Sequence, residues 1–189
     1  LMHYVSWDRT DRDAPKLLAE AGPETLAEFR HDSATLSDGS TWTLISTPEA
    51  GAKATVAETG QELVSAPASL KRDKQIPVMI GGEPYTLIAE SSKNWIIDDA
   101  NGNKVAQFTS DHNGVRRSVL EFDTSSELAH PSSPADPDSQ TALPLDHIVG
   151  LAWVSRLVLE SRKMVNTTAL IGLMVFLSVF VVAVWLLIP

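Results

Sequence analysis

The C-terminal end of the chain places the strongest constraint on what it can fold into. Residues 169 to 188 form a run without a charged side chain, in which Ser178 is the one polar residue. An α-helix rises about 1.5 Å per residue, so about 20 residues cross the roughly 30 Å hydrocarbon layer of a bilayer. A buried core helix is usually shorter, and Trp185 suits an aromatic anchor at a membrane interface. We therefore predict a transmembrane helix over residues 167–188.

The basic residues beside this run predict its orientation. Arg156, Arg162 and Lys163 precede the predicted span, Glu160 offsets them in part, and no basic residue follows. Positively charged flanks stay in the cytoplasm. The N-terminus has no basic patch followed by an apolar core, so we predict no secretory signal. We expect a single-pass protein of the plasma membrane whose N-terminal domain is cytoplasmic.

The charge of the chain bears on its partners. The formal net charge is −9, and every charged residue precedes the predicted span. An acidic domain is repelled by nucleic acid and by anionic lipid headgroups, so we expect no nucleic-acid partner. Two local basic clusters, at Lys71, Arg72 and Lys74 and at Arg116 and Arg117, are interpreted as solvated loops or strand edges.

The middle of the chain has the sequence pattern of a β domain, which we place at residues 41–163. Short β-type runs are predicted at residues 42–45, 54–57, 62–65, 78–80, 85–89, 95–97, 104–108 and 115–122. Turn sequences stand between them, such as Gly81-Gly82, Asn101-Gly102 and Asn113-Gly114. These residues supply the positive φ that tight hairpin turns need. Strands at this spacing predict an antiparallel meander that curls into a sandwich or barrel.

Two segments are expected to lie outside this β-structure. Residues 1–40 are polar, and their one helical candidate is interrupted by Gly22-Pro23, so we predict an N-terminal arm with two short turns that wraps a surface. Residues 127–140 hold three prolines among Ser and Asp, a composition that predicts a mobile loop.

The segment before the predicted span is apolar on every side. Between Ile148 and Leu159 the polar side chains are those of Ser155 and Arg156, so no wide hydrophilic face exists at helical spacing. A helix that is apolar all round is buried all round, and this one is too short to cross a membrane. We predict a buried helix over residues 145–160 that fills the β-structure. The residues thus predict a mainly β fold, a sandwich or barrel around an apolar C-terminal helix, plus one transmembrane helix.

Two resemblances follow from these patterns. The strand Tyr85-Thr-Leu-Ile, the hairpin of residues 95 to 106 and the apolar helix led by Pro144-Leu145 resemble the tubby-like, LURP-one and phospholipid-scramblase group, in which a barrel surrounds a central hydrophobic helix. The chain departs from lipid-binding members in its acidity and lacks the cysteine-rich segment of scramblases. A domain of about 20 kDa with one C-terminal span also looks like an accessory subunit of the actinobacterial cytochrome bcc and oxidase respiratory supercomplex.

Catalytic motifs are not found in the sequence. It contains no cysteine, no Gly-x-Ser-x-Gly, no phosphate-binding loop and no paired histidines at zinc spacing. Asp111-His112 is interpreted as turn chemistry rather than as an acid and base pair. Asp98-Asp99 with Asn101 and Asn103 lacks the glutamate of a calcium loop, which also favours a turn. We expect no enzyme activity, no catalytic residues, no metal and no cofactor.

The predicted span offers one contact face. Thr168 and Gly172 are small residues four apart, a spacing that lets a partner helix approach closely. The sequence therefore favours a non-enzymatic accessory subunit, anchored in the bilayer and docked on an integral, cytochrome-containing membrane complex. The alternative is a membrane-anchored lipid-binding module of the tubby or scramblase kind. A hydrolase or transferase is a third class, because active sites can assemble from distant residues.

Overall fold

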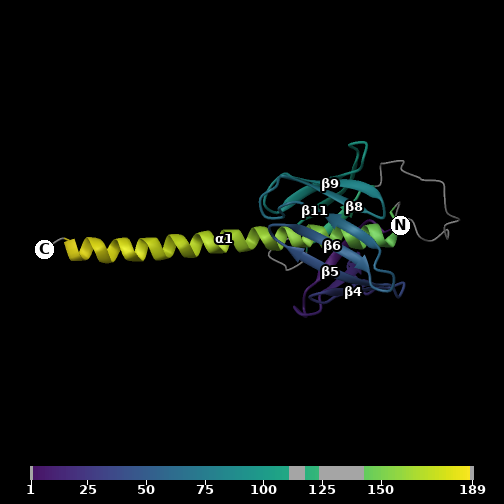
Figure 1. The fold of residues 1–189 in the computed structure, drawn as a ribbon, viewed down its shortest axis with the longest axis horizontal. Helices are drawn as coiled ribbons and strands as arrows, with labels where there is room; N and C mark the ends of the chain where they lie inside the picture. Colours follow the sequence, from purple (N-terminus) through teal and green to yellow (C-terminus); the bar gives the residue numbers. More distant parts are fainter. Residues whose placement is uncertain (1, 111–117, 124–142, 188–189) are drawn as a thin grey trace.

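The computed structural model describes residues 2–110, 118–123 and 143–187 and consists of a closed β-barrel threaded by one helix (Figure 1). Within these residues twelve antiparallel strands follow one another around the barrel in sequence order. Their bounds are β1 Tyr4–Asp8, β2 Lys16–Ala19, β3 Thr25–Phe29, β4 Ser33–Leu36, β5 Thr41–Thr47, β6 Gly51–Val56, β7 Glu62–Ala66, β8 Gln75–Ile80, β9 Glu83–Ala89, β10 Asn94–Asp98, β11 Lys104–Thr109 and β12 Val119–Phe122. The helix α1 comprises Leu145–Leu187. The predicted fold class is confirmed.

The first strand closes the barrel. In β1, Val5 lies opposite Ala19 of β2 on one side and opposite Leu120 of β12 on the other. Each described strand therefore has two neighbours, so the barrel presents no open edge to the strands of another chain.

Residues alternate between the inside and the outside of the barrel. In β8, Ile76, Val78 and Ile80 are buried, and the residues between them are exposed. This period of two matches the pleat of a strand. The same alternation turns aromatic rings inward, and Trp95 of β10 stacks on Phe108 of β11 with ring centroids 4.9 Å apart.

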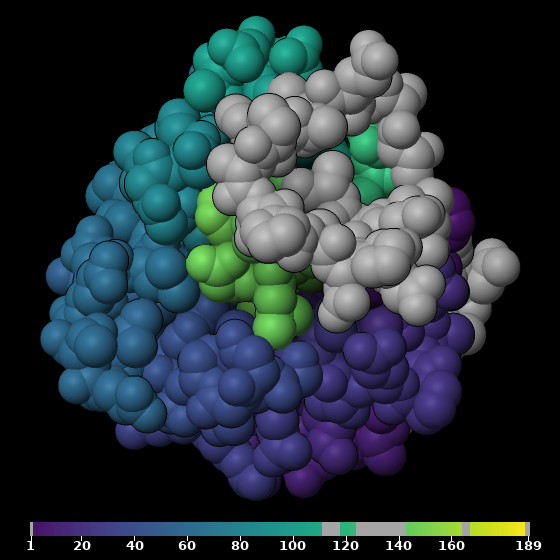
Figure 2. Space-filling view, turned by 90° about the vertical axis from the view of Figure 1, so that its right-hand side faces the viewer, coloured from purple at the N-terminus to yellow at the C-terminus, as the bar shows by residue number. Residues whose placement is uncertain are grey.

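The first part of α1 fills the barrel. Every residue from 147 to 155 is buried, so the helix is covered on all sides. Figure 2 looks into the end where α1 begins and shows green residues of the helix bordered by blue and purple residues of the barrel. A barrel of about eight strands is filled by its own side chains, and the diameter grows with strand number. Twelve strands thus leave room for a helix about 10 Å across.

The helix passes closest to the wall at Gly150. A Cβ atom built on Gly150 would lie 2.9 Å from Cδ1 of Ile80 and 3.1 Å from Cγ2 of Val64. Those two residues face each other across β7 and β8. The missing side chain therefore lets α1 lie against this pair of strands.

The second part of α1 leaves the barrel and continues without a break. From Thr167 to Leu187 every residue is exposed, and these residues are predominantly apolar. At about 1.5 Å per residue this stretch is roughly 30 Å long. It belongs to a helix that is long and apolar enough to cross a membrane. The helices predicted at 145–160 and 167–188 are therefore two parts of one helix.

The predicted N-terminal arm at residues 1–40 is wrong. This segment supplies β1 to β4, a third of the strands of the barrel, and carries core residues such as Trp7, Leu17 and Phe29. Gly22-Pro23 lies in the turn between β2 and β3. A β-bulge between Leu17 and Leu18 buries both leucines, which hides the alternation that would mark a strand.

Two further expectations fall outside the described residues. The predicted mobile loop at 127–140 and the turn at Asn113-Gly114 both lie there. The last predicted β run, 115–122, is described from residue 118 and contains β12.

Candidate functional site

Helix α1 begins at one end of the barrel and leaves at the other, so the two ends can be described separately. Successive loops of an antiparallel barrel lie at alternate ends. The loops at 9–15, 30–32, 48–50, 67–74 and 90–93 lie where α1 leaves, which we call the helix-exit end. The turns at 20–24, 37–40, 57–61, 81–82 and 99–103 lie where α1 begins, which we call the helix-entry end.

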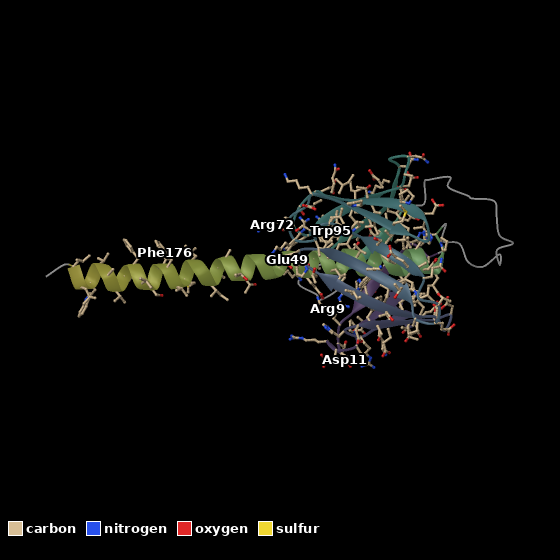
Figure 3. The ribbon with its side chains drawn as sticks, viewed as in Figure 1. Arg9, Asp11, Glu49, Arg72, Trp95 and Phe176 are labelled. Atoms are coloured by element: carbon tan, nitrogen blue, oxygen red, sulfur yellow. The ribbon has the colours of Figure 1, made fainter. Side chains whose placement is uncertain are left out.

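Glu160 joins the helix to the helix-exit end. Its Oε1 accepts hydrogen bonds from Nε of Arg156 at 2.9 Å and from an Nη of Arg9 at 3.1 Å. The guanidinium of Arg156 also lies over the ring of Trp7, 4.8 Å from its centroid. Figure 3 shows Arg9 on the rim beside the departing helix. Of these two charge-assisted bonds, the one to Arg156 lies within the helix, and the one to Arg9 ties the helix to the loop after β1.

Arg162 makes the corresponding contact on another loop. Its guanidinium donates a hydrogen bond to the backbone carbonyl of Asp73 and lies 5.9 Å from the ring centroid of Trp95. Burial lowers the pKa of Arg162, and the charge of Asp73 opposes that change. An arginine stays protonated nonetheless. The cation therefore holds the helix to the loop between β7 and β8.

This loop approaches the helix because β7 and β8 pair only briefly. Their register joins Val64 to Ile80 and Ser65 to Met79. Closer to the helix-exit end β8 contains Pro77, which has no N–H to donate to a neighbouring strand. Leu70 of the loop is buried in the core. The loop between β7 and β8 therefore forms part of the barrel wall where these two strands are no longer paired.

The structure shows barrel contacts for two of the three predicted topology residues. Arg156 and Arg162 are held by the barrel, as described above, whereas Lys163 is exposed. The sequence contains no signal for these contacts, because Trp7, Asp73 and Trp95 lie far from the helix in the chain.

The predicted helix-docking residues lie beyond the barrel. Thr168 and Gly172 are exposed on the free part of α1. A Cβ atom on Gly172 would meet nothing within 4 Å. The surface around Gly172 is therefore open to a partner.

A buried polar pair holds the start of the helix at the helix-entry end. The hydroxyl of Tyr85 and Nδ1 of His147 are 2.8 Å apart. Burial, and then the charges of Glu83 and Asp146, raise the pKa of Tyr85 to about 12. Burial also lowers the pKa of His147 against the opposing effect of the same two carboxylates. Both groups are thus uncharged at neutral pH, and the pair satisfies polar groups that would otherwise be costly to bury.

The sequence motif considered as a calcium site forms a turn in the structure. Oδ1 of Asp99 accepts hydrogen bonds from the backbone N–H groups of Asn101 at 2.8 Å and Asn103 at 2.9 Å, so its carboxylate closes the hairpin between β10 and β11. Asp111-His112 lies outside the described residues. In the described part of the chain, no three His, Asp or Glu residues are grouped to hold a metal ion.

Comparison of the chain with protein-family models, with curated proteins and with solved structures finds no match. Any functional conclusion therefore rests on the helix and on the two ends of the barrel.

Proposed function

We propose that this chain is a non-enzymatic accessory subunit, anchored in the plasma membrane and docked on a larger integral membrane complex. The observation that carries the proposal is the division of α1 into a buried half and an exposed apolar half. An apolar surface of this length is stable in a bilayer and unfavourable in water. A respiratory, cytochrome-containing complex is the partner that the second resemblance implies.

The orientation is part of the proposal. Lys163 and Arg162 lie just before the exposed run, and the described remainder of the helix carries no basic residue. Positive residues at this position favour a cytoplasmic barrel. Digestion of the barrel by protease added to intact cells would contradict this orientation.

The free half of the helix supplies the proposed docking face. Replacing Gly172 by Ile fills the surface beside Thr168 and keeps the helix apolar, so insertion should persist and binding to the complex should weaken. Ser178→Ile is the matched control, because it enlarges another small residue of the same exposed run, about 120° around the helix from Gly172. The measurement is recovery of cytochromes with the tagged chain from native membranes in mild detergent. We expect at least a several-fold loss with Gly172→Ile and none with the control.

Two outcomes would contradict this proposal. Equal recovery with both variants would move the contact from the helix to the barrel. A wild-type chain that migrates alone at about 20 kDa and binds liposomes would instead favour a lipid-binding module of the tubby and scramblase kind. The observation in favour of that alternative is the apolar helix enclosed by a barrel. Because the helix fills the interior, such a module would bind lipid on its outside.

A further inference from the structure

The charges of the barrel are sorted between its two ends. The turns and flanking residues of the helix-entry end carry Glu20, Glu24, Asp38, Glu58, Glu83, Asp98, Asp99 and Asp146, with Lys104 as the one described Lys or Arg among them. The described Lys and Arg residues of the helix-exit end are Arg9, Arg12, Lys16, Arg30, Lys71, Arg72, Lys74, Lys93, Arg156, Arg162 and Lys163. They slightly outnumber the described acidic residues of this end, which are Asp8, Asp11, Asp13, Glu28, Asp32, Glu49, Asp73, Glu90 and Glu160. The net charge of −9 therefore conceals a polarity along the helix axis.

One sector of the helix-exit end carries an excess of positive charge. We call it the basic ledge, and its members are Lys71, Arg72, Lys74, Arg162 and Lys163. Arg162 joins the loop of the first three to the helix through the carbonyl of Asp73. Elsewhere on this end, ion pairs join Arg9 and Arg156 to Glu160 and Arg30 to Glu28. On the ledge, Glu49 pairs with Lys71 and Asp73 lies between Arg72 and Lys74, so the five cations exceed these two carboxylates.

The loop of the ledge is held in place by its own contacts. Oδ2 of Asp73 accepts a hydrogen bond from the backbone N–H of Ser69 at 3.0 Å, and the N–H of Asp73 donates to the carbonyl of Ser69 at 3.0 Å. Leu70 lies in the core between them. Arg72 and Lys74 flank this fixed point and are exposed, and Figure 3 shows Arg72 at the edge nearest the free helix.

The height of the ledge matches the headgroup layer of a bilayer. The exposed run begins at Thr167, four residues after Lys163, which is about 6 Å along a helix. The headgroup region adds roughly 5 to 7 Å on each side of the hydrocarbon layer. With the exposed run in the hydrocarbon layer, the cations of the ledge lie at the level of lipid phosphates.

We infer that the basic ledge binds the phosphate groups of anionic phospholipids around the entering helix. This inference rests on the membrane anchoring in the proposed function and adds a lipid class and the residues that contact it. Arg72, Lys74 and Lys163 bind the headgroups directly, while Arg162 positions the loop. The acidic helix-entry end is repelled by the same surface, so the barrel stands with its helix-exit end against the membrane.

The test uses the full chain reconstituted in vesicles that contain phosphatidylcholine and phosphatidylglycerol. Spin-labelled versions of each lipid report which one is immobilised beside the protein. We expect phosphatidylglycerol to be enriched about threefold to fivefold, because each Lys or Arg near an anionic surface attracts it measurably. The variant Arg72→Gln/Lys74→Gln/Lys163→Gln should abolish the preference. Raising the salt concentration to 1 M, where the screening length is about 3 Å, should weaken it.

The control variant is Lys16→Gln/Lys53→Gln/Lys104→Gln, which removes the same charge from exposed sites away from the ledge. It should keep the preference. An equal loss of the phosphatidylglycerol preference in both variants, or no preference in the wild type, would contradict lipid binding by the basic ledge. Neither result would contradict membrane anchoring by the helix. A ledge variant that loses its cytochromes while the wild type shows no lipid preference would assign the ledge to a protein partner. If the full chain does not float with the vesicles at all, both the membrane anchor and lipid binding by the basic ledge are contradicted.

Discussion

Replacing Gly150 by Leu is expected to prevent the barrel from closing around its helix. The first added carbon alone would lie 2.9 Å from Ile80 and 3.1 Å from Val64, and both side chains are fully buried. Overpacking a filled core costs about 1–3 kcal/mol or more, and leucine adds three further carbons. We expect a loss of at least about 3 kcal/mol in the free energy of unfolding.

The chain provides its own control for this change. Gly172→Leu introduces the same side chain in the same helix, where a Cβ atom meets nothing within 4 Å. Thermal unfolding in detergent, followed by near-UV circular dichroism, reports on Trp7, Trp42 and Trp95 inside the barrel. The signal should be lost or the midpoint sharply lowered for Gly150→Leu alone. Equal midpoints for the two variants would mean that the helix does not lie in the barrel.

Replacing Leu151 by Ala is expected to cost about 2–5 kcal/mol in the free energy of unfolding. The side chain of Leu151 is 0% exposed, so its removal loses transfer free energy and leaves a cavity. Leu173→Ala, at a residue that is 54% exposed on the free helix, should leave the barrel unchanged. Leu157 is half-buried, so its truncation should fall between the two. A loss below about 0.5 kcal/mol for Leu151→Ala in the same thermal experiment would contradict the buried position.

The eight later strands could be predicted because local signals agreed with one another. In β8 and β9 alternating apolar residues flank Gly81-Gly82, and both glycines adopt positive φ in the turn. Hairpins of this kind are set by residues close together in the chain. The position of the helix inside the β-structure could also be predicted, because a helix without a polar face must be enclosed. The choice of a barrel over a sandwich came from the resemblance to a known fold.

The first four strands could not be predicted for a physical reason. The bulge in β2 places Leu17 and Leu18 both in the core, so the period of two is lost over a strand of four residues. The pairing of β1 with β12 joins residues more than 100 positions apart. Only tertiary packing makes such short, irregular segments into strands.

The contacts at the helix-exit end were also beyond sequence reasoning. Arg9 reaches Glu160 across 151 positions, and Arg162 reaches Asp73 across 89. The sequence indicated the cations of the helix and the basic cluster at residues 71–74. It did not indicate that the helix contacts the loop that carries this cluster. This contact forms because the closed barrel places the loops of the helix-exit end beside α1.

We propose that one continuous helix is both the core of the barrel and its membrane anchor. Because the chain contains no cysteine, Ser178→Cys provides a single site for a nitroxide label in the middle of the exposed run. Thr43→Cys, at an exposed residue between the buried Trp42 and Leu44 on the outside of β5, provides a water-exposed reference. Relaxation of each label by oxygen, which concentrates in lipid, and by a water-soluble nickel chelate measures its surroundings.

In vesicles the label at position 178 should respond strongly to oxygen and weakly to the nickel chelate, and the label at position 43 should show the reverse. The tryptophan signal of the folded barrel should be unchanged in both proteins. Strong relaxation by the nickel chelate at position 178, with the barrel intact, would show that the helix does not enter the bilayer and would contradict the account.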